Sequence, residues 1–110
     1  MAQLALNRFQ TVTFQITTAE QTVYTAPTGY TAIVSYAHIA NYSTSDSTVT
    51  MKHIRSGVET EIIKNANVPI SEAFVPMSGK LVLETNDSIK ISSQKNDTLK
   101  VILSLLETAN

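Results

Sequence analysis

Apolar and polar residues alternate with a period of two along most of this chain, and the longest such run covers residues 30–40. Alternation of this kind is typical of β-strands, whose successive side chains point to opposite faces. One face of the run would hold Ala32, Val34, Tyr36, His38 and Ala40, and the other Thr31, Ile33, Ser35, Ala37 and Ile39. Because both faces carry apolar residues, we predict a central strand. Pro27 and Gly29 predict a tight turn before it, over residues 26–29.

Shorter stretches with strand character fill the rest of the chain, separated by turns rich in small polar residues, glycine or proline. They cover residues 9–17, 21–25, 48–55, 58–64, 72–77, 80–84, 88–93 and 98–107. Residues 41–47 are expected to form a surface loop, and Val68-Pro69 an edge position or a crossing between sheets. The pattern predicts a single all-β domain over residues 1–110, a sandwich or barrel of about eight or nine strands with almost no helix.

Composition narrows the classes of function. Charged residues make up 15% of the chain and the net charge is −1, and the lysines and arginines are scattered. Direct nucleic-acid binding is therefore not expected, because it needs a basic surface. No apolar run approaches the ~20 residues that span a bilayer, and the first residues do not resemble a signal peptide. We expect a protein that is not exported by the general secretory route. With no cysteine, disulfides and thiolate metal sites are excluded.

The residues that could carry chemistry are too dispersed to predict an enzyme, a metal site or a cofactor site. The two histidines, His38 and His53, lie on predicted strands with no carboxylate at alternating spacing, and we interpret them as structural. Paired carboxylates across a cleft could hydrolyse glycosides, but Glu59 and Glu61 share one face of a strand and are expected to be solvated. The remaining candidates are aspartates in separate loops, where each is expected to close its own turn: Asp46, Asp87 and Asp97.

Two features leave alternatives open. Tyr24, Tyr30, Tyr36 and Tyr42 recur every six residues; they fit core packing or the rim of a sheet, and the alternative is a stacking platform for sugars. Residues Met1–Asn7 include Leu4 and Leu6. They fit a frayed terminus, and the alternative is an apolar N-terminal arm that contacts a neighbouring subunit.

Three segments resemble a group of small virion structural proteins of tailed bacteriophages, common in phages of marine bacteria and cyanobacteria. The resemblance lies in a Tyr-Thr-Ala-Pro-x-Gly turn before a long strand, a Leu-x-Leu-Glu-x-x-Asp-Ser turn, and a closing strand that ends in Ser-x-x-Glu. In this chain the three elements are residues 24–29, 81–88 and 104–107. Asn86 stands where the pattern usually has glycine, and asparagine also tolerates the left-handed conformation.

The resemblance implies a non-enzymatic component of the virion with a jelly-roll-like β-sandwich. It implies a capsid decoration or cement protein that is made in the host cytoplasm, binds the major capsid protein and assembles as a homo-oligomer, with a trimer favoured. The alternatives are a neck, collar or tail protein, and a carbohydrate-binding module that attaches to the host surface.

Overall fold

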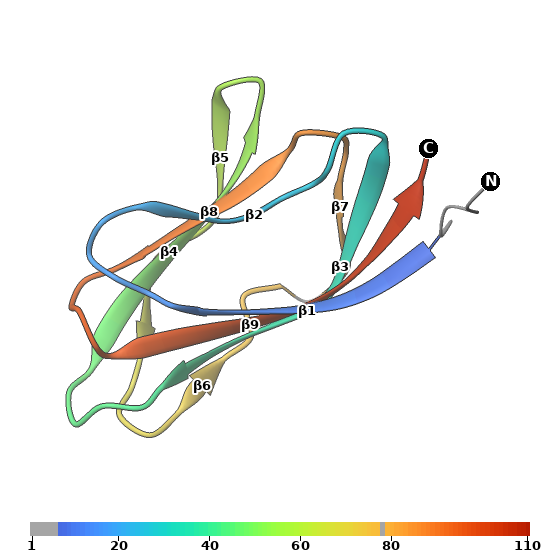
Figure 1. The fold of residues 1–110 in the computed structure, drawn as a ribbon. Helices are drawn as coiled ribbons and strands as arrows, with labels where there is room; N and C mark the ends of the chain where they lie inside the picture. The colour runs from blue at the N-terminus through green and yellow to red at the C-terminus, as the bar shows by residue number, and fades with distance from the viewer. Residues whose placement is uncertain (1–6, 78) are drawn as a thin grey trace.

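The computed structural model describes residues 7–77 and 79–110, and within these ranges it contains nine β-strands and no helix. Figure 1 shows them as two layers, with β1, β9 and β3 in one layer and β2, β8 and β4 in the other. The strands are β1 (Asn7–Gln15), β2 (Gln21–Thr25), β3 (Tyr30–Asn41), β4 (Ser47–Arg55), β5 (Val58–Val68), β6 (Ala73–Phe74), β7 (Leu81–Leu83), β8 (Ser88–Ser93) and β9 (Leu99–Ala109).

The strands pair in a nested order, from the two ends of the chain toward its middle. The five-stranded sheet has the order β1-β9-β3-β6, with β7 also paired to β3, and the four-stranded sheet has the order β2-β8-β4-β5. If β6 and β7 are counted as one interrupted strand, the first strand pairs with the last, the second with the next to last, and so on inward. This is the topology of a jelly roll. The predicted jelly-roll-like β-sandwich is therefore confirmed.

The core lies between the two sheets and is built from the inward positions of the alternating strands. β9 shows the pattern most clearly, since every second residue from Leu99 to Glu107 is buried. β3 pairs with β9 on one side and with β6 and β7 on the other, as predicted for a central strand. The largest fully buried apolar side chains are Ile16, Val34, Ile39, Val49, Met51, Val68, Leu83, Ile89, Ile91, Leu99 and Leu103.

The predicted faces of β3 are wrong beyond Val34, because the strand contains a bulge. Val34 pairs with Leu105 and Tyr36 with Ser104, so Ser35 is an extra residue without a partner. A bulge shifts the alternation by one position. As a result Ala37, Ile39 and Asn41 are buried, whereas Tyr36 is exposed and His38 and Ala40 are half-buried.

Two connections show how the chain moves between sheets. Val68-Pro69 ends β5 in the four-stranded sheet and leads to β6 in the five-stranded sheet, so the predicted crossing is correct. The predicted surface loop over residues 41–47 is correct only for its middle, because Asn41 and Ser47 are buried. The Asn41 side chain donates to the carbonyls of Ser45 (2.8 Å) and Val68 (2.9 Å) and thereby joins this loop to the end of β5.

We predict that Val34→Asp unfolds the protein and leaves it insoluble. Val34 has no exposed surface, and an unpaired carboxylate there would cost at least about 4 kcal/mol of folding free energy. The matched control is Ile33→Asp, because Ile33 lies on the opposite face of the same strand and is expected to cost about 1 kcal/mol or less. Solubility and circular dichroism measure both variants, and a soluble, folded Val34→Asp protein would contradict the inward placement of Val34.

Candidate interaction face

The three segments that carry the phage resemblance come together at one end of the sandwich. The turn after β2 and the turn before β8 both carry the chain between the sheets. They are joined by paired backbone hydrogen bonds, from Ala26 N to Asp87 O (2.8 Å) and from Asn86 N to Ala26 O (2.9 Å). Asn86 has a φ of 70°, so it adopts the left-handed conformation that its replacement of glycine requires. We call this end, together with the last residues of β9, the crossing end.

Glu107 is a buried carboxylate at the crossing end and is 1% exposed. It points from β9 toward the four-stranded sheet, where Tyr24 of β2 donates a hydrogen bond to it. Arg8 Nη2 lies 2.8 Å from Glu107 Oε1, and Gln10 Nε2 donates to the same oxygen at 2.9 Å. Burial and the hydrogen bond to Glu107 raise the pKa of Tyr24 above its ordinary value. These donors compensate the charge that folding removes from water.

Asp87 is the second buried carboxylate at this end and is 2% exposed. Arg55 binds it through two nitrogens, with Nη2 2.7 Å from Oδ2 and Nε 3.1 Å from Oδ1. The backbone N–H of Glu84 donates to Oδ2 at 2.9 Å, and His53 Nε2 lies 3.1 Å from the same oxygen. The hydrogen bonds from Arg55 contribute most to holding the pKa of Asp87 at about 2. His53 and Asp87 are thus parts of a structural ion-pair cluster.

The other candidate side chains lie apart from these clusters. Asp46 accepts a hydrogen bond from the backbone of Ile70 and Asp97 one from the Gln15 side chain, so only Asp87 binds within its own turn. His38 Nδ1 lies 2.6 Å from the Tyr36 hydroxyl. Glu59 and Glu61 are exposed, as predicted. Among residues 7–77 and 79–110, no three His, Cys, Asp or Glu side chains are grouped to hold a metal ion.

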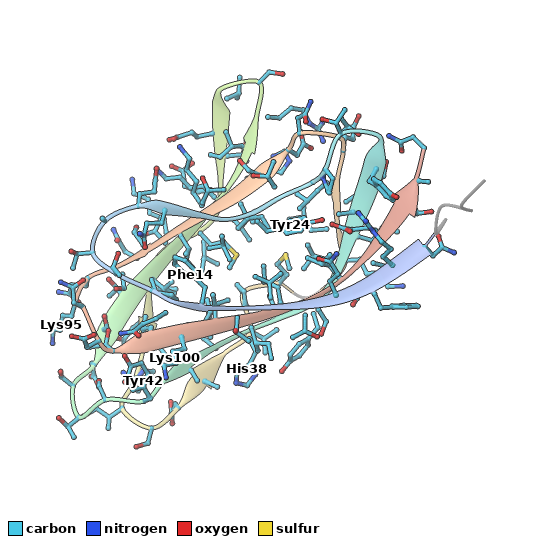
Figure 2. The ribbon with its side chains drawn as sticks, viewed as in Figure 1. Phe14, Tyr24, His38, Tyr42, Lys95 and Lys100 are labelled. Atoms are coloured by element: carbon cyan, nitrogen blue, oxygen red, sulfur yellow. The ribbon has the colours of Figure 1, made fainter. Side chains whose placement is uncertain are left out.

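The four evenly spaced tyrosines do not share a surface. Tyr24 is in the core, and the guanidinium of Arg8 covers the ring of Tyr30 at 4.1 Å. Tyr36 and Tyr42 are 45% and 46% exposed, and Lys100 Nζ lies 4.6 Å from the centre of the Tyr42 ring. Figure 2 shows Tyr24 between the layers, and Tyr42 and Lys100 together outside them. Core and rim positions are thus confirmed for Tyr24 and Tyr30.

The outer face of the five-stranded sheet is almost free of charge. Arg8, Lys100 and Glu107 are the charged residues in its strands, and Arg8 and Glu107 form the ion pair described above. The outward residues that remain between the crossing end and Lys100 contain no Asp, Glu, Lys or Arg, and we call this surface the neutral face. Across the sheet they form the rows Asn7–Thr108–Thr31, Phe9–Leu106–Ile33–Val82, Thr11–Ser104–Tyr36 and Thr13–Ile102–His38.

One row of the neutral face is entirely apolar. Phe9 pairs with Leu106, Leu106 with Ile33, and Ile33 with Val82, so four apolar side chains lie side by side across four strands. Phe9 is 85% exposed and Val82 is 51% exposed, so much of the apolar surface of these two residues is in contact with water. Contiguous exposed apolar surface of this kind is typical of a contact with another protein.

The outer face of the four-stranded sheet differs in charge. Lys52 and Lys90 lie opposite each other on it, and Lys52 pairs with Glu20 at 2.8 Å and Glu59 at 3.1 Å. Charged groups are costly to remove from water, whereas hydroxyl and apolar groups are cheaper to cover. The neutral face is therefore the better suited of the two to bind protein. Within the described residues, no helix is long and apolar enough to cross a membrane.

The fold, but no sequence family, connects this chain to known proteins. No family model and no curated protein matches the sequence. A chain of the Bacillus endospore appendages, which form disulfide-linked pili, superposes with a TM-score of 0.58 at 9% identity, over 99% of this chain and 96% of that one. A chain of the capsid of Helicobacter pylori bacteriophage KHP30 gives 0.57 at 10% identity, over 94% and 88%.

A chain of the T13 IBDV viral particle superposes with a TM-score of 0.58 at 12% identity. The match covers 96% of this chain but 32% of the viral one, so this chain spans about a third of that protein. At these identities the likeness establishes the β-sandwich fold.

Sequence reasoning missed both the acidic clusters and the neutral face. Arg55 and Asp87 are 32 residues apart and Tyr24 and Glu107 are 83 apart, so neither pair shares a local motif. The one signal in the sequence for this region was the resemblance to phage virion proteins, because the three segments that carry it meet at the crossing end. The N-terminal arm interpretation falls mostly on residues 1–6, which lie outside the described residues.

We expect Tyr24→Phe to destabilise the protein by about 1–3 kcal/mol, because buried Glu107 loses a donor. Tyr42→Phe, at an exposed ring, should change the free energy of unfolding by less than about 0.5 kcal/mol. Urea denaturation measures both changes, and equal stabilities would contradict the importance of the Tyr24–Glu107 hydrogen bond.

A second prediction concerns the stability of the protein at low pH. Because the pKa of Asp87 falls from 3.8 to about 2 on folding, its stabilising effect is complete above pH 4 and disappears as the pH falls toward 2. This effect should amount to about 2 kcal/mol. Asp87→Asn should therefore flatten the loss of stability between pH 4 and pH 2, whereas Glu61→Gln should leave it unchanged. Denaturation at several pH values tests this, and parallel curves for wild type and Asp87→Asn would refute it.

Proposed function

We propose that this chain is a structural protein of a bacteriophage virion, a decoration or cement protein that binds and stabilises the capsid exterior. It has no catalytic role in this proposal. Support comes from the resemblance at residues 24–29, 81–88 and 104–107 and from the fold shared with the KHP30 capsid chain. That the chain belongs to this particular group of phage proteins is likewise proposed.

The neutral face is the observation that carries the proposal. A structural protein of a virion works by contact with neighbouring proteins, its own copies included. It therefore needs surface that can be covered without stripping water from ions, and the neutral face provides such surface across β1, β9 and β3. The major capsid protein is the proposed partner, contacted by loops, strand edges or the N-terminal segment. Many copies on one lattice raise the effective concentration, so each contact can be weak.

We further propose that the protein acts as a homo-oligomer, with a trimer favoured. Residues 1–110 form a single domain in this proposal, and Met1–Asn7 is the segment from which a contacting arm would extend.

Two alternatives have specific tests. A neck, collar or tail protein would use the same kind of surface but would occupy a single ring of the particle. A carbohydrate-binding module is favoured by one observation, the partial exposure of Tyr36 and Tyr42. It predicts saturable binding on a glycan array that Tyr36→Ala reduces, whereas the decoration protein predicts no such binding.

Quantitative mass spectrometry of purified virions tests the proposal directly. A decoration protein should be present in a number comparable with the major capsid protein, since it repeats with the capsid lattice. Heating particles with and without the protein should show that its loss lowers the temperature at which DNA is released. A copy number that fits one ring would support the neck or tail alternative, and absence from the virion would refute the proposed function.

A further inference from the structure

We propose that the neutral face is the contact between copies of this chain, with Phe9 of one copy seated in a hollow on the next. The inference deepens the proposed function, because it rests on a protein that acts as a homo-oligomer and assigns the surface that joins the copies. Two observations support it. The exposed ring of Phe9 lies beside a hollow, and the polar side chains of the face can hydrogen-bond to the same residue types on another copy.

The ring and the recess lie next to each other on the neutral face. Among the described residues, Phe9 is the most exposed of the large apolar side chains at 85%. Beside it is a hollow of about 190 Å³, lined by Phe9, Gln10, Thr11, Ser35, Ser104 and Leu105. The bulge at Ser35 contributes to this hollow, because it places Ser35 and Tyr36 successively on the exposed side of β3. Because a copy that inserts its Phe9 also offers its own hollow, the contact can repeat from copy to copy, and it forms a ring when the rotation between copies closes.

The remaining side chains of the face are suited to meet copies of themselves. Threonine, serine, asparagine and tyrosine each carry both a donor and an acceptor, so they can hydrogen-bond to the same residue types. The four rows of the face contain no Asp, Glu, Lys or Arg, so no like charges meet within them when two copies approach; Lys80 lies at their border, where it lines a hollow with Ser35 and Tyr36. The outer face of the four-stranded sheet would instead bring lysines such as Lys52 and Lys90 near their counterparts.

The face is large enough for a specific contact. Strands lie ~4.8 Å apart and outward residues ~6.8 Å apart along a strand, so three to four strands and four rows give roughly 400 Å² in projection. Side-chain relief adds to this, and two copies would bury on the order of 1,000 Å², near the lower limit for specific interfaces. The rotation between copies sets the symmetry: a half turn gives a dimer, and a third of a turn gives the favoured trimer.

Cysteine labelling tests the contact, because the chain has no cysteine of its own. Ser104→Cys places a single thiol in the hollow, and Ser92→Cys places the matched control on the outer face of the other sheet. We expect a bulky maleimide to react with Ser104→Cys roughly tenfold more slowly once the protein is about tenfold above its dissociation constant. Ser92→Cys should react at the same rate at all concentrations.

Charge substitution provides the second measurement. Phe9→Lys and Val82→Lys, alone and combined, place like charges where copies would meet, and the double variant should raise the dissociation constant at least about tenfold. Val58→Lys is the control, because Val58 is 65% exposed on β5 of the other sheet. Sedimentation equilibrium measures the association, and circular dichroism checks that each variant folds. Should the double variant fail to fold, the labelling experiment alone decides.

The inference and the proposed function can fail separately. A wild-type protein that stays monomeric up to about 1 mM would overturn the contact, as would an oligomer that leaves Ser104→Cys fully reactive or survives Phe9→Lys unchanged. If such a protein is still abundant in virions, the proposed function stands without this contact. If the copies associate as described but the virion lacks the protein, the function fails and the contact remains.

Discussion

Glu107 places a charged group between the two sheets, and the rest of the structure depends on how that charge is satisfied. Tyr24 reaches it from β2, and Arg8 and Gln10 reach it from β1. The edge strand β1 and, in the other sheet, β2 must therefore both be in register with β9 at the crossing end. An unsatisfied carboxylate at this depth would oppose folding by several kcal/mol, so the cluster specifies one alignment of β1, β9 and β2.

That alignment also decides what the outside of the five-stranded sheet looks like. With Arg8 and Glu107 turned inward, the next positions along β1 and β9, Phe9 and Leu106, are turned outward and lie opposite each other. A slip of β1 by one residue would reverse every side chain of the strand. The ion pair at buried Glu107 and the exposed apolar row are therefore two consequences of one register, and the sandwich has one charged outer face and one neutral outer face.

Alternation along the chain was enough to predict the strands, the central place of β3 and the Val68-Pro69 crossing, because burial on one face leaves a period of two in the sequence. It failed at Ser35, since a bulge adds one residue without any distinctive side chain, and the faces of Tyr36 and His38 were reversed. It also could not find the neutral face, because the alignment of Phe9, Leu106, Ile33 and Val82 depends on pairing between strands far apart in sequence. The partners of Asp87 were hidden for the same reason.

A density map of the intact virion at a resolution that separates the two sheets would test the central claim most directly. We expect many copies of this sandwich on the capsid exterior, with the outer face of β1, β9 and β3 covered by protein and the outer face of β8 and β4 in contact with solvent. A map in which the sandwich is present but its β1-β9-β3 face is bare would contradict the account.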